Sequence, residues 1–266
     1  MSVRVAQLPA LRWPDVSLRA LRVWQRNRDV YLKLWKSEVV WPAVEPFIAL
    51  FALGAGLGDI VELEGGQRYI EFIAPGLLAV WPTWAAAGEC GWGSFFRMEN
   101  QRTFEAIVAT PVSIGDVITG EILWGGTRAL MNSVYILAII AAWGLVDSPL
   151  AVLTIPLALL SGLMFAGIAL SYTSVAKSIS SLNYFFGLFM IPQFWVSGVF
   201  FPLDQLPEWA QRVAWWMPAT HVVDLYRGLI RGDLGWGHLE DMAWMVVVAA
   251  IFYAVALFSM RRRLVK

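Results

Sequence analysis

The run SPLAVLTIPLALLSGLMFAGIALSYTSVA, at residues 148–176, contains no charged side chain. About 20 apolar residues in an α-helix are enough to cross the hydrocarbon core of a bilayer, which is about 30 Å thick. The run is longer than this, and it lacks the alternation with a period of two that a strand of a membrane barrel would have. It therefore predicts a membrane-spanning helix, which we place at residues 150–173.

Five further segments have the same apolar character, and the composition agrees with them. Hydrophobic residues make up 58% of the chain and charged residues 15%, against about 45–50% and about 25% in a soluble domain. This excludes a soluble globular enzyme and predicts an all-α polytopic membrane protein with six transmembrane helices. The predicted spans are 39–58, 72–92, 117–143, 150–173, 182–203 and 242–260, in a transmembrane domain at 39–266 that follows a cytoplasmic arm at 1–38.

Basic residues are divided unevenly between the two sides of the predicted membrane, although the formal net charge is zero. Fifteen of the 20 Lys and Arg residues fall in the arm, the connection 93–116, the turn at Lys177 and the C-terminal tail, and four fall on the opposite side. Because cytoplasmic loops carry an excess of Lys and Arg, we predict that both termini are cytoplasmic.

The arm carries an amphipathic pattern over residues 18–36. At 100° per residue, most apolar and basic side chains separate onto two sides of a helix. The apolar side carries Leu21, Trp24, Tyr31 and Trp35, and the basic side carries Arg19, Arg22, Arg26 and Lys33. We expect a helix that lies in the inner interface of the membrane; the alternative is a solvated basic tail.

The connection 93–116 is too long and too patterned for a simple turn. Thr103 can cap a short helix that presents Phe104, Ile107 and Val108 on one face, and Pro111 disfavours helix before it. We expect this cytoplasmic helix to lie parallel to the membrane. It either covers the bundle or forms a docking element for a cytosolic partner, and the pattern alone favours neither.

The segment from Ser197 to Asp233, on the outer side, predicts a pair of short helices. Pro207 suits the start of the first, and Gly232 suits the end of a second helix over residues 220–231. Neither helix is long enough to span a membrane. We expect a re-entrant helical hairpin in the outer leaflet; the alternative is a hairpin that lies flat on the surface.

Motifs for catalysis and for nucleotide binding are missing from the sequence. There is no GxxxxGK[ST] phosphate loop, no GxSxG nucleophile elbow and no HExxH metal motif. Cys90 is the one cysteine, and the chain has two histidines, so we expect no metal site and no catalytic residues. Any role driven by ATP would need another subunit.

Four ionisable residues lie within the predicted spans, where each charge costs about 2.5–3.5 kcal/mol at the bilayer centre. These candidates for function are Glu45, Glu89, Glu121 and Arg128. Glu121 and Arg128 are seven residues apart on one helix face, so they cannot pair without bridging groups. The glutamates alternatively reach a membrane face by snorkelling, whereas Arg128 lies deeper and needs a buried partner or a polar path.

Longer motifs resemble those of the ABC-2 type permeases over nearly the whole chain. The motifs that carry this resemblance are Thr103-Phe104-Glu105, Ala109-Thr110-Pro111-Val112-Ser113 and Ser197-Gly198-Val199-Phe200-Phe201-Pro202-Leu203. Five shorter motifs are similar to the nodulation-factor exporter (NodJ-like) branch of the family and its drug-exporter relatives: Gly54-Ala55-Gly56-Leu57-Gly58, Phe96-Arg97-Met98, Gln101-Arg102-Thr103, Gly115-Asp116 with Gly120-Glu121, and Asp204-Gln205-Leu206-Pro207.

The resemblance implies a homodimer in which each copy docks on a separate ATP-binding cassette ATPase subunit. ATP and Mg would bind to that partner, so we expect no cofactor on this chain and no nucleic acid partner. The implied docking residues are Arg102, Phe104, Glu105, Ile107, Thr110 and Pro111. Gly54 and Gly58, which form one GxxxG motif, are candidate dimer contacts.

The resemblance also implies a transport path bordered by the first and fifth spans, in a bacterial inner membrane among lipids. Candidate residues of the path or its gate are Glu45, Arg128, Gln193, Trp195, Phe200 and Phe201. The expected function is outward export of an amphiphile, such as a lipo-oligosaccharide, a glycolipid or a hydrophobic drug. The alternative is an ATP-independent secondary transporter or channel, which predicts an inverted repeat; the sequence shows none.

Overall fold

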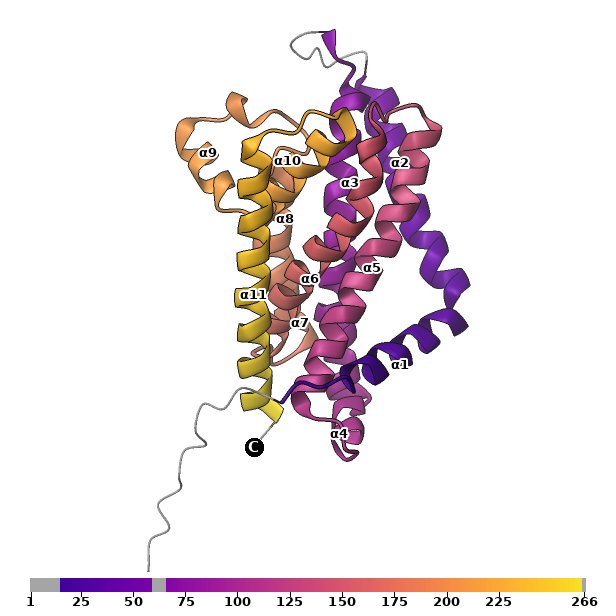
Figure 1. Cartoon of the computed structure of the whole chain (residues 1–266), viewed down its shortest axis with the longest axis vertical. Coiled ribbons are helices and arrows are strands. Elements are labelled where there is room, and N and C mark those ends of the chain that lie inside the picture. The colour runs from indigo at the N-terminus through magenta and orange to yellow at the C-terminus, as the bar shows by residue number, and fades with distance from the viewer. Residues whose placement is uncertain (1–14, 59–65, 265–266) are drawn as a thin grey trace, which may run out of the picture.

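The computed structural model describes residues 15–58 and 66–264, and these residues form a helical bundle (Figure 1). The α-helices are α1 (Ala20–Lys33), α2 (Trp35–Leu57), α3 (Tyr69–Gly88), α4 (Thr103–Val108), α5 (Ile114–Ala142), α6 (Thr154–Thr173), α7 (Ile179–Phe185), α8 (Ile191–Val196), α9 (Glu208–Trp215), α10 (Pro218–Arg231) and α11 (Trp236–Leu264). Short π-helical segments are η2 (Glu89–Gly93), η3 (Phe96–Asn100) and η5 (Phe186–Met190), and 3₁₀ segments are η4 (Pro149–Leu153) and η6 (Leu203–Gln205).

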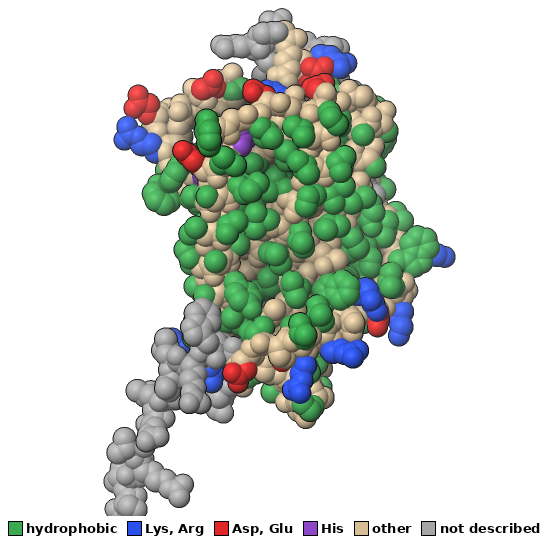
Figure 2. All heavy atoms as spheres, in the orientation of Figure 1, with side chains coloured by type: hydrophobic (Ala, Val, Ile, Leu, Met, Phe, Trp, Pro, Cys, Tyr) green, Lys and Arg blue, Asp and Glu red, His purple; other side chains and the backbone are tan. Residues whose placement is uncertain are grey.

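Within the described ranges, four helical stretches are long and apolar enough to cross a membrane. They are Tyr69–Asn100, Ile114–Ala142, Pro149–Thr173 and Trp236–Leu264, and the bent pair Ala20–Lys33 and Glu38–Gly54 adds a fifth if it counts as one span. Figure 2 shows hydrophobic side chains around the middle of the molecule and charged side chains towards its two ends. The chain is therefore a multi-pass membrane protein, but the prediction of six spans is not confirmed.

Two of the predicted spans have different bounds in the structure. The helix that begins at Tyr69 continues through η2 and η3 to Asn100, so residues 93–100 are helical and do not belong to a loop. In place of the predicted span 182–203, a helix runs without a break through α7, η5 and α8 and ends at Val196. It stops there because the chain turns at Gly198, which adopts the left-handed conformation with φ 80°.

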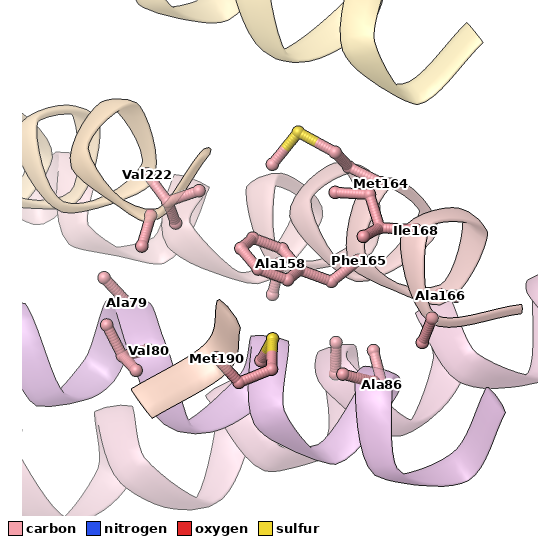
Figure 3. Close-up of a cluster of buried hydrophobic side chains, with 14 of the residues drawn as sticks. Ala79, Val80, Ala86, Ala158, Met164, Phe165, Ala166, Ile168, Met190 and Val222 are labelled. Carbon is pink, nitrogen blue, oxygen red and sulfur yellow. The ribbon is translucent and has the colours of Figure 1, made fainter. Parts of the chain in front are cut away.

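Helix α6 lies at the centre of the bundle and packs against α3, α5 and α11. Figure 3 shows part of this region, in which Phe165 of α6 lies above the helix α3 that carries the small residues Ala79 and Ala86. The approach of α5 and α6 depends on Gly162, because a Cβ atom there would lie 2.5 Å from the Cβ of Ala129. Small residues thus set the spacing of these helices.

Replacing Gly162 with leucine is expected to lower the stability of the bundle, because the added side chain would force α5 and α6 apart. Overpacking of a core costs about 1–3 kcal/mol and sometimes more. The measurement is the melting temperature of the purified protein in detergent. The matched control is Gly187→Leu, since a Cβ at Gly187 meets nothing within 4 Å. Equal melting temperatures for the two variants would contradict the packing argument.

Helix α1 meets the following helix at 99° and packs across α5 near one end of the bundle (Figure 1). Its residues Val23 and Asn27 are buried, and a Cβ at Gly120 of α5 would lie 2.6 Å from the Cβ of Val23. Leu21 and Trp35, on the predicted apolar side, are 46% and 52% exposed. The predicted amphipathic helix is present, and its position in the membrane interface stays a prediction.

A single carboxylate fixes the starts of α5 and α1. Asp116 Oδ2 accepts a hydrogen bond from the Ser113 backbone N–H at 3.0 Å, and Ser113 Oγ accepts one from the Asp116 N–H at 3.0 Å. This capping box satisfies backbone donors that a helix start leaves open. Asp116 Oδ1 also accepts a hydrogen bond from the Ser17 backbone N–H at 2.6 Å, so the chain that enters α1 is bound to the first turn of α5.

The short helix α4 lies at the end of the molecule opposite α9 and α10 (Figure 1). The prediction that Thr103 caps this helix is wrong, because Thr103 is its first helical residue and Arg102 occupies the cap position without a side-chain hydrogen bond. Arg102 has φ 51°, the one non-glycine residue with positive φ in the described chain. It makes a sharp joint between η3 and α4.

The outer segment contains the expected pair of helices, and their environments differ. Trp209 and Trp216, in and just after α9, are 70% and 69% exposed. In contrast, α10 packs against α3 and α11, and Tyr226 is completely buried. Gly232 ends α10 in the left-handed conformation with φ 77°, as its position predicted. The re-entrant placement of this hairpin stays a prediction.

Candidate functional site: a charged network beside an aromatic pocket

The carboxylate of Glu121 lies inside the protein at the centre of a polar network. Its side chain is 1% exposed. Oε1 accepts a hydrogen bond from Asn27 Nδ2 at 2.9 Å, Oε2 accepts one from Ser94 Oγ at 2.5 Å, and Arg97 forms an ion pair with Oε2. Glu121 therefore does not reach a membrane face by snorkelling, because its charge is satisfied within the chain.

Arg97 and Glu89 connect Glu121 to Arg128. Arg97 Nη1 lies 2.7 Å from Glu89 Oε1, and Arg128 Nε lies 3.6 Å from Glu89 Oε2. Arg128 also pairs with Glu38 at 2.8 Å, and its guanidinium lies 4.7 Å from the centre of the Tyr31 ring. The bridging groups that the seven-residue spacing requires are thus present, and Arg128 has two ion partners, Glu89 with 15% and Glu38 with 37% of its side chain exposed.

The π-helical turns of η2 and η3 present Glu89 and Arg97 to this network. A π turn contains more residues than an α turn and often occurs at functional sites. Gly93 lies between the two charges, and a Cβ there would lie 3.0 Å from Glu89 Oε1 and 3.3 Å from Arg97 Nη1. The absence of a side chain at Gly93 therefore leaves room for the ion pair.

A pocket of about 630 Å³ lies directly beside the network. Five aromatic rings contribute to its wall, and charged or amide groups lie among them. The lining residues are Glu45, Trp81, Trp84, Ala85, Gly88, Glu89, Trp92, Gly93, Arg128, Asn132, Ile191, Phe194 and Trp195. Its volume falls within the range of about 300–1,000 Å³ that is typical of small-molecule sites. The arrangement suits a ligand with an apolar body and a polar group.

Contacts between rings hold the aromatic wall in place. Trp92 stacks on Phe186 with centroids 3.6 Å apart, and Trp81 meets Phe194 edge to face at 5.8 Å. Trp195 is 52% exposed and stacks on Phe200 at 4.5 Å. The pocket wall is therefore continuous with rings that lie beyond it.

The structure brings together only part of the predicted path. Glu45, Arg128 and Trp195 line the pocket, and Phe200 stacks against its wall. Gln193 points elsewhere, because its Oε1 accepts a hydrogen bond from the Ala219 N–H of α10 at 3.3 Å. Phe201 is partly exposed and does not line the pocket.

The predicted docking residues divide into an inward and an outward set. Phe104 is 1% exposed and belongs to the hydrophobic core, and Ile107 packs partly against it. The outward set is exposed and consists of Arg102, Glu105, Thr110 and Pro111. Phe104 thus anchors α4 to the bundle, and only the outward set offers side chains to a partner.

Gly54, a predicted dimer contact, faces its own chain in the structure. A Cβ at this position would lie 2.5 Å from Ile70 Cδ1 of α3. In this chain Gly54 therefore permits α2 to pack closely against α3. A dimer contact through Gly54 and Gly58 stays a prediction.

Charged groups of α10 lie near the opposite end of the bundle from α4. Burial, together with the nearby carboxylate of Asp241, raises the pKa of Asp224. Burial lowers the pKa of Arg227 to about 10, and the Arg227 guanidinium lies 4.0 Å from the centre of the Phe72 ring. These groups are separate from the aromatic pocket. In the described chain, no cluster of three or more His, Cys, Asp and Glu side chains could hold a metal ion.

The sequence does not predict that several residues belong to this site. Arg97 follows the end of the apolar run at Trp92, where the sequence predicts a loop, and Asn27 lies on a helix whose pattern concerns only apolar and basic side chains. Trp81 and Trp84 lie in a span rich in aromatic residues, where position alone does not show which rings face a cavity. The spacing of Glu89 and Arg97 gives no signal for the ion pair, because eight residues of an α-helix rise about 12 Å and turn about 80° off the same face; the pair forms across the π-helical turns of η2 and η3.

Several helices long enough to span a membrane, with a charged aromatic pocket among them, define a membrane transport protein. The family model for the ABC-2 type transporter matches residues 20–230, so the chain belongs to the ABC-2 type transporter family. The predicted resemblance to this family is therefore confirmed.

Curated relatives cover most of the chain. Nodulation protein J of Rhizobium leguminosarum bv. trifolii is 33% identical over 253 residues, which cover 95% of this chain and 97% of the relative. Nodulation protein J of Rhizobium meliloti (strain 1021) is 34% identical over 229 residues, or 86% of each protein. Inner membrane transport permease YadH of Escherichia coli (strain K12) is 24% identical over 241 residues, which cover 88% and 91%.

Proposed function

We propose that the chain is the membrane-embedded permease subunit of an exporter that moves an amphiphile outward, with energy from a separate ATP-binding cassette ATPase. Two copies form the path, in the inner membrane of a bacterium, with both termini and α4 in the cytoplasm. ATP and Mg bind to the ATPase subunit. The cargo has an apolar part and a polar part, as in a lipo-oligosaccharide, a glycolipid or a hydrophobic drug.

One observation carries the proposal: a single stretch of chain joins the pocket to α4. Glu89 and Gly93 line the pocket, and Arg97 in η3 pairs with Glu89 and Glu121. η3 ends at Asn100, and α4 begins at Thr103 with Phe104 set in the core. A displacement of α4 would therefore act on the ion pairs beside the pocket. This is the mechanical link that an external ATPase requires.

Basic residues support the proposed orientation. Figure 2 shows Lys and Arg side chains gathered at the end that carries α1 and α4. Arg263, close to the C-terminus, pairs with Glu99 of η3 at 2.7 Å and donates to the Thr173 backbone oxygen at 2.6 Å. The inner ends of α3, α6 and α11 are thereby joined at one face, which the positive-inside rule assigns to the cytoplasm.

The proposal is tested with Glu105→Arg, a charge reversal on the exposed side of α4. We expect the variant to insert normally and to lose co-purification with its ATPase subunit, because the reversal places a cation at the proposed contact surface. The matched control is Glu208→Arg, the same reversal on α9 at the opposite end, which should leave co-purification unchanged. Normal recovery of the ATPase with Glu105→Arg would contradict the proposed docking surface. Transport by the permease in vesicles without any ATPase would instead favour the ATP-independent alternative.

A further inference from the structure

Glu89 presents one carboxylate oxygen that accepts no hydrogen bond from the described residues. Its Oε1 accepts from Arg97 Nη1 at 2.7 Å. Its Oε2 has only the ion contact with Arg128 Nε at 3.6 Å, which is too long for a hydrogen bond, and that Nε has no hydrogen-bond partner in the described chain. Because Glu89 lines the aromatic pocket, this oxygen gives the pocket a weakly compensated negative group.

A second carboxylate, that of Glu45, lines the same pocket. In the part of the chain that the structure describes, Glu45 forms no ion pair within 4.0 Å. Glu38, by contrast, holds Arg128 at 2.8 Å on the other side of the network. The pocket therefore has two acidic groups, and its single lining cation, Arg128, already has Glu38 as a close partner.

The charges of the network do not cancel this acidity. The ion pairs contain three carboxylates and two guanidinium groups: Glu38, Glu89, Glu121, Arg97 and Arg128. Arg26 interacts electrostatically with Glu89 and Glu121, so it adds a third positive charge and brings the network to a formal charge of zero. With Glu45 added, the formal charge on the side of the aromatic pocket is negative. Away from bulk water, such a charge acts more strongly.

The aromatic wall supplies a second attraction for positive charge. Trp81, Trp84, Trp92, Phe194 and Trp195 all line the pocket. The face of an aromatic ring carries partial negative charge and attracts a desolvated cation within about 6 Å of the ring centre. Rings and carboxylates that converge on one cavity favour a cation with an apolar body.

We infer that the pocket binds a monovalent hydrophobic cation, which Glu45 and the Oε2 atom of Glu89 hold among the aromatic rings. This inference rests on the proposed function, since it names the chemical class of the cargo at the same site. The bound cation competes with Arg128 for Glu89, and Arg128 keeps its closer partner, Glu38. Neutral and anionic amphiphiles of the same size gain no such contact.

The test measures binding of tetraphenylphosphonium to the purified full-length permease in a neutral detergent, by equilibrium dialysis. We expect saturable binding, and no saturable binding of the isosteric anion tetraphenylborate.

Glu45→Gln should weaken tetraphenylphosphonium binding by about tenfold, since it removes one nearby charge, and Glu45→Asp should restore most of it. Trp195→Leu should weaken binding by about threefold to thirtyfold through the lost ring. Both Glu45 and Trp195 are exposed to the pocket side, so these variants should fold.

Matched controls lie on α9, where Glu208→Gln and Trp209→Leu alter exposed side chains and should leave binding unchanged. Equal binding of tetraphenylphosphonium and tetraphenylborate would overturn the inference, as would an affinity that Glu45→Gln does not change. An absence of saturable binding would overturn it as well. None of these outcomes involves the ATPase, so a complex that forms normally would leave the proposed function standing. If Glu105→Arg leaves recovery of the ATPase unchanged while the permease still binds the cation, only the exporter proposal is contradicted.

Discussion

Replacing Arg97 with methionine is expected to destabilise the bundle by about 3–5 kcal/mol, the usual cost of removing one partner from a buried ion pair. The variant leaves Glu121, which is 1% exposed, without a cation and leaves Glu89 with the 3.6 Å contact to Arg128. Methionine keeps the apolar stem of arginine but lacks the guanidinium group, so the variant removes the charge together with its hydrogen bonds to Glu89 and Glu121. The measurement is the melting temperature in detergent, followed by size-exclusion chromatography.

A second variant separates the charge effect from the loss of packing. Arg97→Met combined with Glu121→Gln keeps acceptor and donor atoms for Asn27 and Ser94 while removing the uncompensated carboxylate, so part of the stability should return. Arg212→Met is the surface control, because the Arg212–Glu208 pair is 82% and 88% exposed and contributes little. If Arg97→Met melts at the same temperature as Arg212→Met, the network does not stabilise the fold.

Replacing Phe104 with alanine is expected to detach α4 from the bundle. The side chain is 1% exposed, and truncation of a buried phenylalanine costs about 3–5 kcal/mol. For a helix of six residues, this loss exceeds what its own hydrogen bonds supply, since short helices are unstable alone. We expect trypsin to cleave after Arg102 in inside-out vesicles, and the ATPase subunit to be lost on purification.

The control for this experiment is Val108→Ala on the same helix. Val108 is 37% exposed, so its truncation removes little packing and should leave Arg102 resistant to trypsin. Full protease resistance of Phe104→Ala, together with normal recovery of the ATPase, would show that α4 does not depend on Phe104. The result also separates anchoring from docking, because Glu105→Arg should disturb the partner without unfolding the chain that follows Arg102.

Long apolar runs and backbone signals were the features most readily predicted from the sequence. Residues 150–173 contain no charge, and the helix there spans Pro149–Thr173. Gly232 ends α10 because glycine adopts a positive φ without steric cost. Such signals depend on a few neighbouring residues, so the predictions made from them do not depend on the tertiary packing.

Features that depend on distant contacts were harder to predict. The sequence near Trp92 has no proline that would end the helix, yet the loss of apolar character suggests a loop. The ion pairs of Arg97 with Glu89 and Glu121 compensate its charge, so the helix can continue to Asn100. Glu121 was expected to reach a membrane face, but Asn27, which lies 94 positions earlier in the chain, donates a hydrogen bond to its carboxylate inside the bundle. No local pattern contains such a pairing. The pocket is likewise defined by rings from α3 and α8, which meet only in the folded bundle.

The capping carboxylate of Asp116 has a practical consequence for observing motion. Because it accepts hydrogen bonds from both Ser17 and Ser113, the chain before α1 and the first turn of α5 form one mechanical unit. Val16 is 45% exposed and lies beside this joint, away from the pocket. A spectroscopic label at position 16 would therefore act as a reporter of displacement at the inner end of α5, without altering any residue of the pocket or of α4.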